Sequence, residues 1–519
     1  MPIPPSQQRL ADALETLKYI QGEGRSVIKS AEITRLQRES LVKSGFLQQI
    51  VKGWYMPSRP GDAQGESTPW YAAMLDFVRG YSEERFGAKW HVSAEYSALL
   101  YAGTTVIPKQ VVVHSPKGQN GLLELPDNCS IFDYKAKDFP AEKKIQSVSG
   151  VRVLSLPLTL VRVPKDFFVK FPHDAQIALH MLSDVSELNH ELLDGGHSIV
   201  AGRLAGALRA VGLDRMANEV LATMRAAGYP ATETNPFMIS PPALEHHRRQ
   251  SPYVIRMRLM WQEMRPIVIE NFPPEPGMPV DIENYILNVE EKYQTDAYHS
   301  LSIEGYRVTD ELIQRVATGR WSPEDNASDK EAKNALAAHG YWLAHNNVKE
   351  TIRAILGGRN AGTAFDDDHR TWHRSLFAPN VAAGFLKQSD LAGYRSGQVF
   401  IRYASHVPPS PVSVRDMMPE LVALLEGESS AAVRAVLGHF MFVFIHPYID
   451  GNGRLGRFLM NTMLASGGYP WTVIHIEQRP EYMSALEAAS SQGDIRPFVR
   501  LIAKSLFQTG VNVLGLRED

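Results

Sequence analysis

The stretch Val443-Phe-Ile-His446-Pro-Tyr-Ile-Asp450-Gly-Asn-Gly-Arg-Leu-Gly-Arg457-Phe-Leu-Met crowds a histidine, a carboxylate, an asparagine and two arginines around closely spaced glycines. An apolar run precedes it over 431–445, and periodic apolar residues follow it over 454–465. The pattern therefore predicts a helix on each side and a loop between them. We expect a mainly α-helical C-terminal domain built around this loop.

The loop has the groups that bind an anion. Gly451 and Gly453 let backbone N–H groups approach a phosphate closely, and the start of the following helix adds its positive dipole end. Arg454 and Arg457 lie three residues apart on one helix face and can hold phosphate oxygens as bidentate donors. The sequence therefore predicts a phosphate-binding loop.

Two further side chains supply the chemistry. Asp450 offers an acceptor-only carboxylate that suits Mg²⁺ among phosphates. His446 can act as a general base near neutral pH. An anion cradle, a cation, arginines and a base are the parts that phosphoryl or nucleotidyl transfer requires.

Two other interpretations of the loop are less well supported. The spacing Gly451-x-Gly453-x-x-Gly456 matches a dinucleotide fingerprint, but that fingerprint needs a preceding strand, whereas a helical segment precedes it here. A capped helix–turn–helix with incidental polar residues is the second interpretation. The crowding of five functional side chains argues against it.

The stretch resembles the signature of the Fic family, His-x-Phe-x-Asp/Glu-Gly-Asn-Gly-Arg-x-x-Arg, with Tyr448 in place of the usual Phe. The similarity covers about residues 285–510 and includes Gly468-Tyr-Pro and Gly493-Asp-Ile-Arg-Pro-Phe. The resemblance implies transfer of AMP from ATP to a Ser, Thr or Tyr hydroxyl of a target protein, with Mg²⁺ as cofactor. It also implies a mainly α fold with a β-hairpin flap.

The resemblance assigns a role to each matching residue. His446 would deprotonate the target hydroxyl, and Asp450 would hold Mg²⁺. Arg457 would bind the γ-phosphate. For Tyr482, the adenine pocket and a plain core position are both open. The full set expected to bind the nucleotide is Gly451, Asn452, Gly453, Arg454, Gly456, Arg457 and Tyr482.

A second stretch, Tyr298-His-Ser300-Leu-Ser-Ile-Glu304-Gly305, resembles the Ser-x-x-x-Glu-Gly inhibitory motif of one class of Fic proteins. Ser300 and Glu304 are four residues apart and would share a helix face. The family places this glutamate against the second arginine of the signature, Arg457, where it would exclude the γ-phosphate. A solvated helix end is the alternative.

A third stretch, 393–402 followed by Val407-Pro-Pro-Ser-Pro, resembles the Fic flap. Its β-prone run could pair with an extended target segment through main-chain hydrogen bonds, or it could be an ordinary surface hairpin. The run consists of Gln398, Val399, Phe400, Ile401 and Arg402.

The first 60 residues predict a winged helix, with helices over 7–21, 30–37 and 39–44 and a hairpin that turns at Lys52-Gly53. This segment holds nine Lys/Arg and five Asp/Glu, a net charge of +4 in a chain of net charge −3. Contact with DNA and contact with a protein are both open. The basic residues near the predicted recognition helix and wing are Arg35, Arg38, Lys43 and Lys52.

The next part, 61–235, predicts a mixed α/β domain with no catalytic constellation. Strands are expected over 111–114, 129–134 and 151–156, and helices over 172–182 and 199–225. Residues 1 to about 235 resemble the AbiEi-type antitoxins and related winged-helix regulators, mainly through 41–55. That resemblance implies a regulatory half of the kind found in toxin–antitoxin systems.

The 519 residues therefore divide into domains at 1–60, 61–235 and 245–519, with an inhibitory helix over about 290–305 and a core over about 330–510. Lys and Arg number 54 against 57 Asp and Glu. The chain as a whole therefore has no excess of positive charge that would indicate nucleic-acid binding. The single cysteine, Cys129, excludes an intrachain disulfide and fits a reducing cytoplasm. We expect neither a signal peptide nor a membrane span; a homodimer is open.

Two functions from different classes follow. The first is an autoinhibited protein adenylyltransferase, with removal of AMP as a second activity in which Glu304 positions water. The second is a winged-helix DNA-binding regulator whose Fic fold senses a ligand or dimerises. The intact catalytic positions favour the first.

Overall fold

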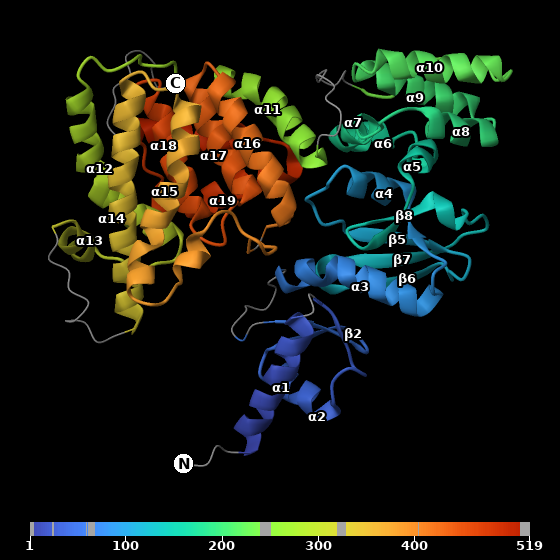
Figure 1. Cartoon of the computed structure of the whole chain (residues 1–519), viewed down its shortest axis with the longest axis horizontal. Helices are drawn as coiled ribbons and strands as arrows, with labels where there is room; N and C mark the ends of the chain where they lie inside the picture. The colour runs from blue at the N-terminus through green and yellow to red at the C-terminus, as the bar shows by residue number, and fades with distance from the viewer. Residues whose placement is uncertain are drawn as a thin grey trace. The chain divides into compact units, whose positions relative to one another are not determined.

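The computed structural model describes residues 5–22, 25–58, 60, 68–238, 251–318, 329–402 and 404–508. The chain forms two compact units (Figure 1). One comprises Met1–Arg256 with Phe400–Val407, and the other comprises Met257–Val399 with Pro408–Asp519. The expected domain start at residue 245 lies outside the described residues. No helix in the described ranges combines the length and hydrophobicity that a membrane span needs.

The first unit begins with two helices and a three-stranded antiparallel sheet of order β1-β3-β2. The hairpin predicted at Lys52-Gly53 is confirmed, because β2 and β3 pair on either side of it. The helix predicted over 30–37 is wrong. Residues 28–29 pair with β3 instead, and one helix starts at Arg35 because Thr34 and Gln37 form a capping box. The elements are α1 (Pro5–Gly22), β1 (Ile28–Lys29), α2 (Arg35–Lys43), β2 (Leu47–Val51) and β3 (Trp54–Pro57).

A mixed sheet of order β4-β5-β7-β6 follows, in which β5 and β7 run parallel. The three predicted strands are present, although the last ends two residues early. Helix α3 and the sheet enclose an aromatic core that includes Trp70, Phe77 and Trp90. The elements are α3 (Thr68–Phe86), β4 (His91–Val92), α4 (Ala94–Tyr101), β5 (Gln110–Ser115), β6 (Gly121–Glu124), β7 (Ser130–Lys135), β8 (Ile145–Val148) and β9 (Val151–Leu154).

Six short helices complete the described part of this unit before α11. The single helix predicted over 199–225 is two helices, because Gly212 adopts φ +81° and ends the first. Their apolar faces share one core with α5 to α8. The helices are α5 (Leu156–Arg162), α6 (Phe167–Lys170), α7 (Pro172–His180), α8 (Ser186–Asp194), α9 (Ser198–Ala210) and α10 (Asp214–Ala226).

The second unit is helical, and α17 is buried along nearly its whole length. The helix predicted over 431–445 is confirmed with its bounds, and the one predicted over 454–465 starts two residues earlier. α11 contains the boundary between the units. The helices are α11 (Pro252–Asn271), α12 (Ile282–Ile303), α13 (Asp310–Ala317), α14 (Asp329–Leu356), α15 (Ala361–Ala382), α16 (Pro411–Gly427), α17 (Ala431–Ile445), α18 (Asn452–Ala465), α19 (Arg479–Gln492) and α20 (Arg496–Gln508), with 3₁₀ turns η3 (Gln388–Leu391) and η4 (Ile476–Gln478).

The run predicted to be β-prone, 398–402, forms no strand in the described part of the chain. Gln398 turns its amide back to donate to the carbonyl of Pro408 at 2.6 Å. The segment Phe400–Val407 belongs to the first unit, where Val407 N–H donates to the carbonyl of Thr105 at 2.7 Å. High strand propensity therefore did not produce a hairpin here, because a strand needs a paired neighbour.

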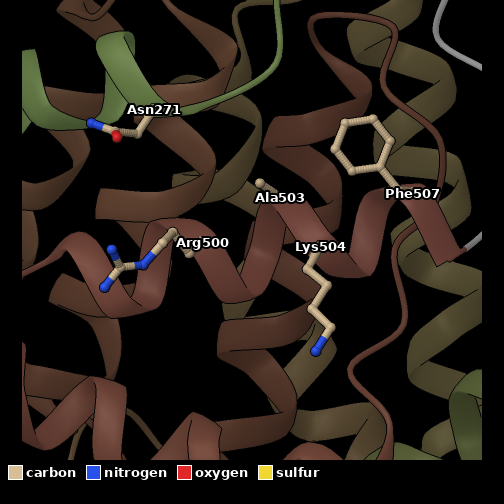
Figure 2. A pocket seen from close by; sticks show the side chains of 5 residues that line it. All are labelled: Asn271, Arg500, Ala503, Lys504 and Phe507. Atoms are coloured by element: carbon tan, nitrogen blue, oxygen red, sulfur yellow. The ribbon is translucent and has the colours of Figure 1, made fainter. Parts of the chain in front are cut away.

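An open pocket in the second unit lies between the end of α11 and α20 (Figure 2). Its lining is Asn271, Arg500, Ala503, Lys504 and Phe507. None of the residues singled out from the sequence lines it.

Candidate active site

The loop between α17 and α18 is shaped by its own sequence. Pro447 lacks an N–H and cannot extend α17, and His446 adopts φ +53° as the cap of that helix. Gly451 adopts φ +88° directly before α18, a conformation that favours glycine. Asn452 closes the loop: its side chain accepts from Tyr448 N–H at 2.9 Å and donates to Tyr448 C=O at 2.8 Å. The side-chain amide of Asn452, which was expected to bind the nucleotide, thus stabilises the conformation of the loop.

His446 is partly buried, and burial lowers the pKa of its imidazole to about 4. Its Nδ1 donates to the carbonyl of Val443 at 3.3 Å, which leaves the lone pair on Nε2. The ring is therefore neutral at pH 7 and has a nitrogen that can accept a proton, as a general base requires.

Asp450 lies at the open side of the loop, with 62 % of its side chain exposed. Its Oδ1 accepts from Gly451 N–H at 2.6 Å, and Arg454 Nη2 lies 3.4 Å away. Mg²⁺ in nucleotide sites is commonly held by one or two carboxylates together with phosphate oxygens and water. An exposed carboxylate beside an arginine and a helix N-terminus fits that role.

Arg454 is held by aromatic rings. Its side chain is 1 % exposed, and its guanidinium carbon lies 5.2 Å from the ring centroid of Tyr306 and 5.1 Å from that of Phe377. Such cation–π contacts fix the plane of the guanidinium and compensate for the loss of water. The side chain is therefore prepositioned beside Asp450.

Arg457 is buried and bound to α12. Its Nε donates to Ser300 Oγ at 2.8 Å, and its Nη2 donates to Ser300 C=O at 3.0 Å and to Glu304 Oε1 at 2.8 Å. Burial opposes the charge of Arg457, but the carboxylate of Glu304 and nearby Tyr482 and Tyr341 outweigh it and raise its pKa. The structure thus brings Ser300, Glu304 and Arg457 together.

Two glycines of the loop and α18 have different surroundings. A Cβ at Gly453 would lie 2.2 Å from Glu304 Oε1, so the carboxylate occupies the space that a side chain would fill. A Cβ at Gly456 would meet Val443 and His439 of α17. Gly456 therefore allows α17 and α18 to pack closely. Gly453, in contrast, leaves room beside the loop for the carboxylate of Glu304.

Tyr482 of α19 is buried, and its hydroxyl lies 2.9 Å from His439 Nε2. Burial raises the pKa of Tyr482, and the nearby positive charge of Arg457 acts in the opposite direction. The expected flap residues are divided between the two units. Gln398 and Val399 belong to the second unit, and the remaining three, Phe400, Ile401 and Arg402, belong to the first.

Two residues that sequence reasoning missed support the loop. Arg395 is 2 % exposed and donates from Nε to the carbonyl of His446 at 2.8 Å; burial lowers its pKa to about 10. His373 of α15 stacks on Tyr448 with ring centroids 3.8 Å apart. Both lie more than 50 residues from the side chains they position, so no local pattern pointed to them.

One further cluster has metal-ligating side chains: His299, His475 and Glu477, whose potential ligand atoms lie within 4.8 Å of one another. The Nδ1 of His299, however, accepts from Ile476 N–H at 3.1 Å. That lone pair is the one a metal would need, so we assign no metal to this cluster.

Comparison with known proteins finds matches over this site. The model of the Fic/DOC family matches residues 366–464. The "Protein adenylyltransferase Fic" of Drosophila virilis is 33 % identical over 217 residues, 41 % of this chain and 41 % of that protein. The protein of the same name from Drosophila willistoni is also 33 % identical, over 41 % of this chain and 40 % of the relative.

The chain therefore spans about two fifths of the length of these curated relatives. A solved structure of Fic-1 (aa134–508) from C. elegans is also similar, with a TM-score of 0.36 and 19 % identity, over 68 % of this chain and 89 % of that one. The family match contains α17, the loop and α18, together with the His446–Arg457 motif. Residues 366–464 of this chain, with the His446–Arg457 motif among them, therefore match the Fic/DOC family.

Proposed function

We propose that this chain is a protein adenylyltransferase that α12 holds in an inhibited state. The observation that carries the proposal is the contact of Glu304 with Arg457, beside a His446–Arg457 motif in which the expected catalytic positions are intact. The name of the Drosophila relatives supports the activity, and the expected reaction uses ATP as substrate.

In the proposed reaction, Nε2 of His446 takes the proton from a Ser, Thr or Tyr hydroxyl of the target protein. The oxygen then forms a bond to the α-phosphorus of ATP, and the bond from that phosphorus to the bridging oxygen breaks, so pyrophosphate leaves. Because its pKa is lowered, the ring of His446 is unprotonated at neutral pH and can accept this proton. Mg²⁺, when bound, would neutralise phosphate charge, and Asp450 is the residue that would hold it.

The anion cradle has three parts. Backbone N–H groups at the start of α18 face the phosphates, as does the positive end of the helix dipole. Arg454, fixed between Tyr306 and Phe377, stabilises charge on the α- and β-phosphates. Arg457 is the donor left for the γ-phosphate.

Inhibition follows from competition for Arg457. Glu304 occupies Nη2 of that guanidinium, so a γ-phosphate cannot bind the same donor. Holding activity near 1 % needs about 2.7 kcal/mol, since each 1.36 kcal/mol is tenfold. Exposed ion pairs contribute only about 0–1 kcal/mol. The side chain of Arg457 is 3 % exposed and that of Glu304 is 31 % exposed, so one partner of the pair is shielded from water, which supports the proposal.

The test is labelling with ATP that carries a radioactive α-phosphate. The purified wild type and Glu304→Gly are compared for self-labelling and for labelling of proteins in a lysate. We expect strong labelling with the variant and weak labelling with the wild type. If the variant binds ATP normally and labels nothing, the chain is not an adenylyltransferase.

A further inference from the structure

The chain that leaves α12 makes a tight turn at Gly305. Glu304 is the C-cap of α12, and Gly305 follows it with φ +86°, a conformation that side chains other than glycine rarely adopt. Gly305 N–H donates to the carbonyl of Ser302 at 3.0 Å, and Tyr306 N–H donates to that of Leu301 at 3.1 Å. These two bonds form a Schellman motif. The motif fixes the position of Tyr306 relative to Glu304.

Tyr306 is also held from α14. The next residue, Arg307, donates its N–H to Asn334 Oδ1 at 3.2 Å. One residue earlier on α14, Nζ of Lys333 lies 5.7 Å from the ring centroid of Tyr306. The Tyr306 side chain is half-buried. Contacts with two helices, α12 and α14, therefore fix its backbone and its ring.

The turn faces both arginines of α18. Before the glycine, Glu304 Oε1 accepts from Arg457 Nη2 at 2.8 Å. After the glycine, the ring centroid of Tyr306 lies 5.2 Å from the guanidinium carbon of Arg454. Residues 454 and 457 are three apart and lie on the same side of α18. One turn of chain thus contacts both side chains that are expected to bind the phosphates of ATP.

The two contacts have opposite consequences for a nucleotide. The carboxylate of Glu304 engages a donor of Arg457, as described above. The ring of Tyr306 fixes the plane of the Arg454 guanidinium without compensating its charge as a carboxylate would. The buried Nε of Arg454 has no hydrogen-bond partner among the described residues. Arg454 therefore keeps a donor for an acceptor such as a phosphate oxygen.

We propose that Tyr306 is a positioning residue that holds Arg454 for the α- and β-phosphates. The end of α12 then has two opposite functions, because Glu304, two residues earlier, blocks Arg457. The inference rests on the proposed function and names the regulation of the same site. Activation has to free Arg457 while the end of α12 stays in place. Displacement of the whole helix end would remove the inhibitory carboxylate and the support of Arg454 together.

The first test measures the binding of ADP with Mg²⁺ by calorimetric titration. ADP has no γ-phosphate, so it does not need the donor that Glu304 occupies in the wild type. Tyr306→Leu removes the ring, and Tyr306→Phe keeps it. The matched control is Tyr298→Leu, at a half-buried tyrosine of α12 whose ring contacts His299.

We expect Tyr306→Leu to raise the dissociation constant of ADP at least threefold, the effect of losing one shielded cation–π contact. Tyr306→Phe and Tyr298→Leu should bind ADP as the wild type does. Equal affinities of the wild type and Tyr306→Leu would overturn the inference, and so would an absence of ADP binding to the wild type.

The second test measures labelling in the Glu304→Gly background, where the inhibitory carboxylate is already absent. Tyr306→Leu should lower kcat/KM for ATP at least threefold there, and Tyr306→Phe should keep it. An equal loss in Tyr306→Phe would overturn the inference, because the ring would not carry the effect. An equal loss in Tyr298→Leu would also overturn it, since general loosening of α12 would explain both losses.

The ADP titration separates this inference from the proposed function. If Glu304→Gly binds ATP and labels nothing, the chain is not an adenylyltransferase. The ADP affinities of the wild type, Tyr306→Leu and Tyr306→Phe then still decide whether Tyr306 supports the phosphate site.

Discussion

The arginines of α18 in the second unit and those of α2 in the first unit have different environments. On α18 of the second unit, Arg454 and Arg457 have side chains 1 % and 3 % exposed, and each has an identified partner. On α2 of the first unit, the side chain of Arg35 is 81 % exposed and pairs with Glu39, itself 56 % exposed. Burying a charged guanidinium is unfavourable unless the fold supplies partners for it. An exposed guanidinium stays hydrated, and its ion pairs contribute little to stability. The two buried arginines of α18 are therefore better candidates for an anion site than the exposed Arg35 of α2.

The basic residues of α2 and the hairpin show how little charge is free there. Arg38 donates to Ser30 C=O at 3.3 Å and lies 5.8 Å from the ring of Tyr55, and Arg35 is paired as described. Lys43 and Lys52 are exposed. The net charge of the segment thus overstates what it offers to DNA.

The largest effect should come from His446→Ala, which removes the base from the site. We expect labelling by the Glu304→Gly protein to fall by about 10²–10⁴-fold, the usual contribution of a positioned base. His190→Ala, at an exposed histidine of α8, is the control and should label normally. Undiminished labelling by His446→Ala with a normal circular dichroism spectrum would remove His446 from the mechanism.

The next effect is the release of Arg457. We expect Glu304→Gln, which keeps the shape of the side chain and loses its charge, to raise labelling at least tenfold. Glu290→Gln is a matched control on the same helix, where Glu290 pairs with Lys349 on an exposed surface. If Glu304→Gln and Glu290→Gln label equally, the contact between Glu304 and Arg457 does not inhibit.

A smaller effect tests the exposed region. If the first 60 residues contact DNA through Lys43 and Lys52, retardation of a DNA duplex at low salt should weaken only a few-fold in Lys43→Ala. The log–log salt slope should become less steep by about one unit. Arg35→Ala should change the slope less, because Glu39 already compensates its charge. No retardation of any duplex by the full chain would favour a protein partner for this module.

The smallest expected effect is that of pH. Because burial lowers the pKa of His446 to about 4, the ring stays neutral throughout the range from pH 6 to 8. Labelling by the Glu304→Gly protein should therefore change less than about twofold in that range and fall only near pH 5 and below. An acid limb centred near 6.5, the value for a free imidazole, would show that His446 is more hydrated than its burial indicates.

The loop and its two helices could be predicted because their determinants are local. Pro447, Gly451 and the apolar period of 431–445 each act on neighbouring residues, and α17 has the expected bounds. The expected helix over 30–37 and the expected strand over 398–402 failed because strand pairing is decided by distant residues. The supporting roles of Arg395 and His373 were missed for the same reason.

The surroundings of Gly453 limit which substitutions could remove the proposed inhibition and keep the activity. Glu304 occupies the space beside a Cα that has no side chain, and the nucleotide would approach that same bare backbone. Any larger residue at 453 would expel the glutamate, but it would also obstruct the phosphates. Constitutively active variants should therefore arise in α12 and not in the loop, so a genetic screen for them would map the inhibitory helix.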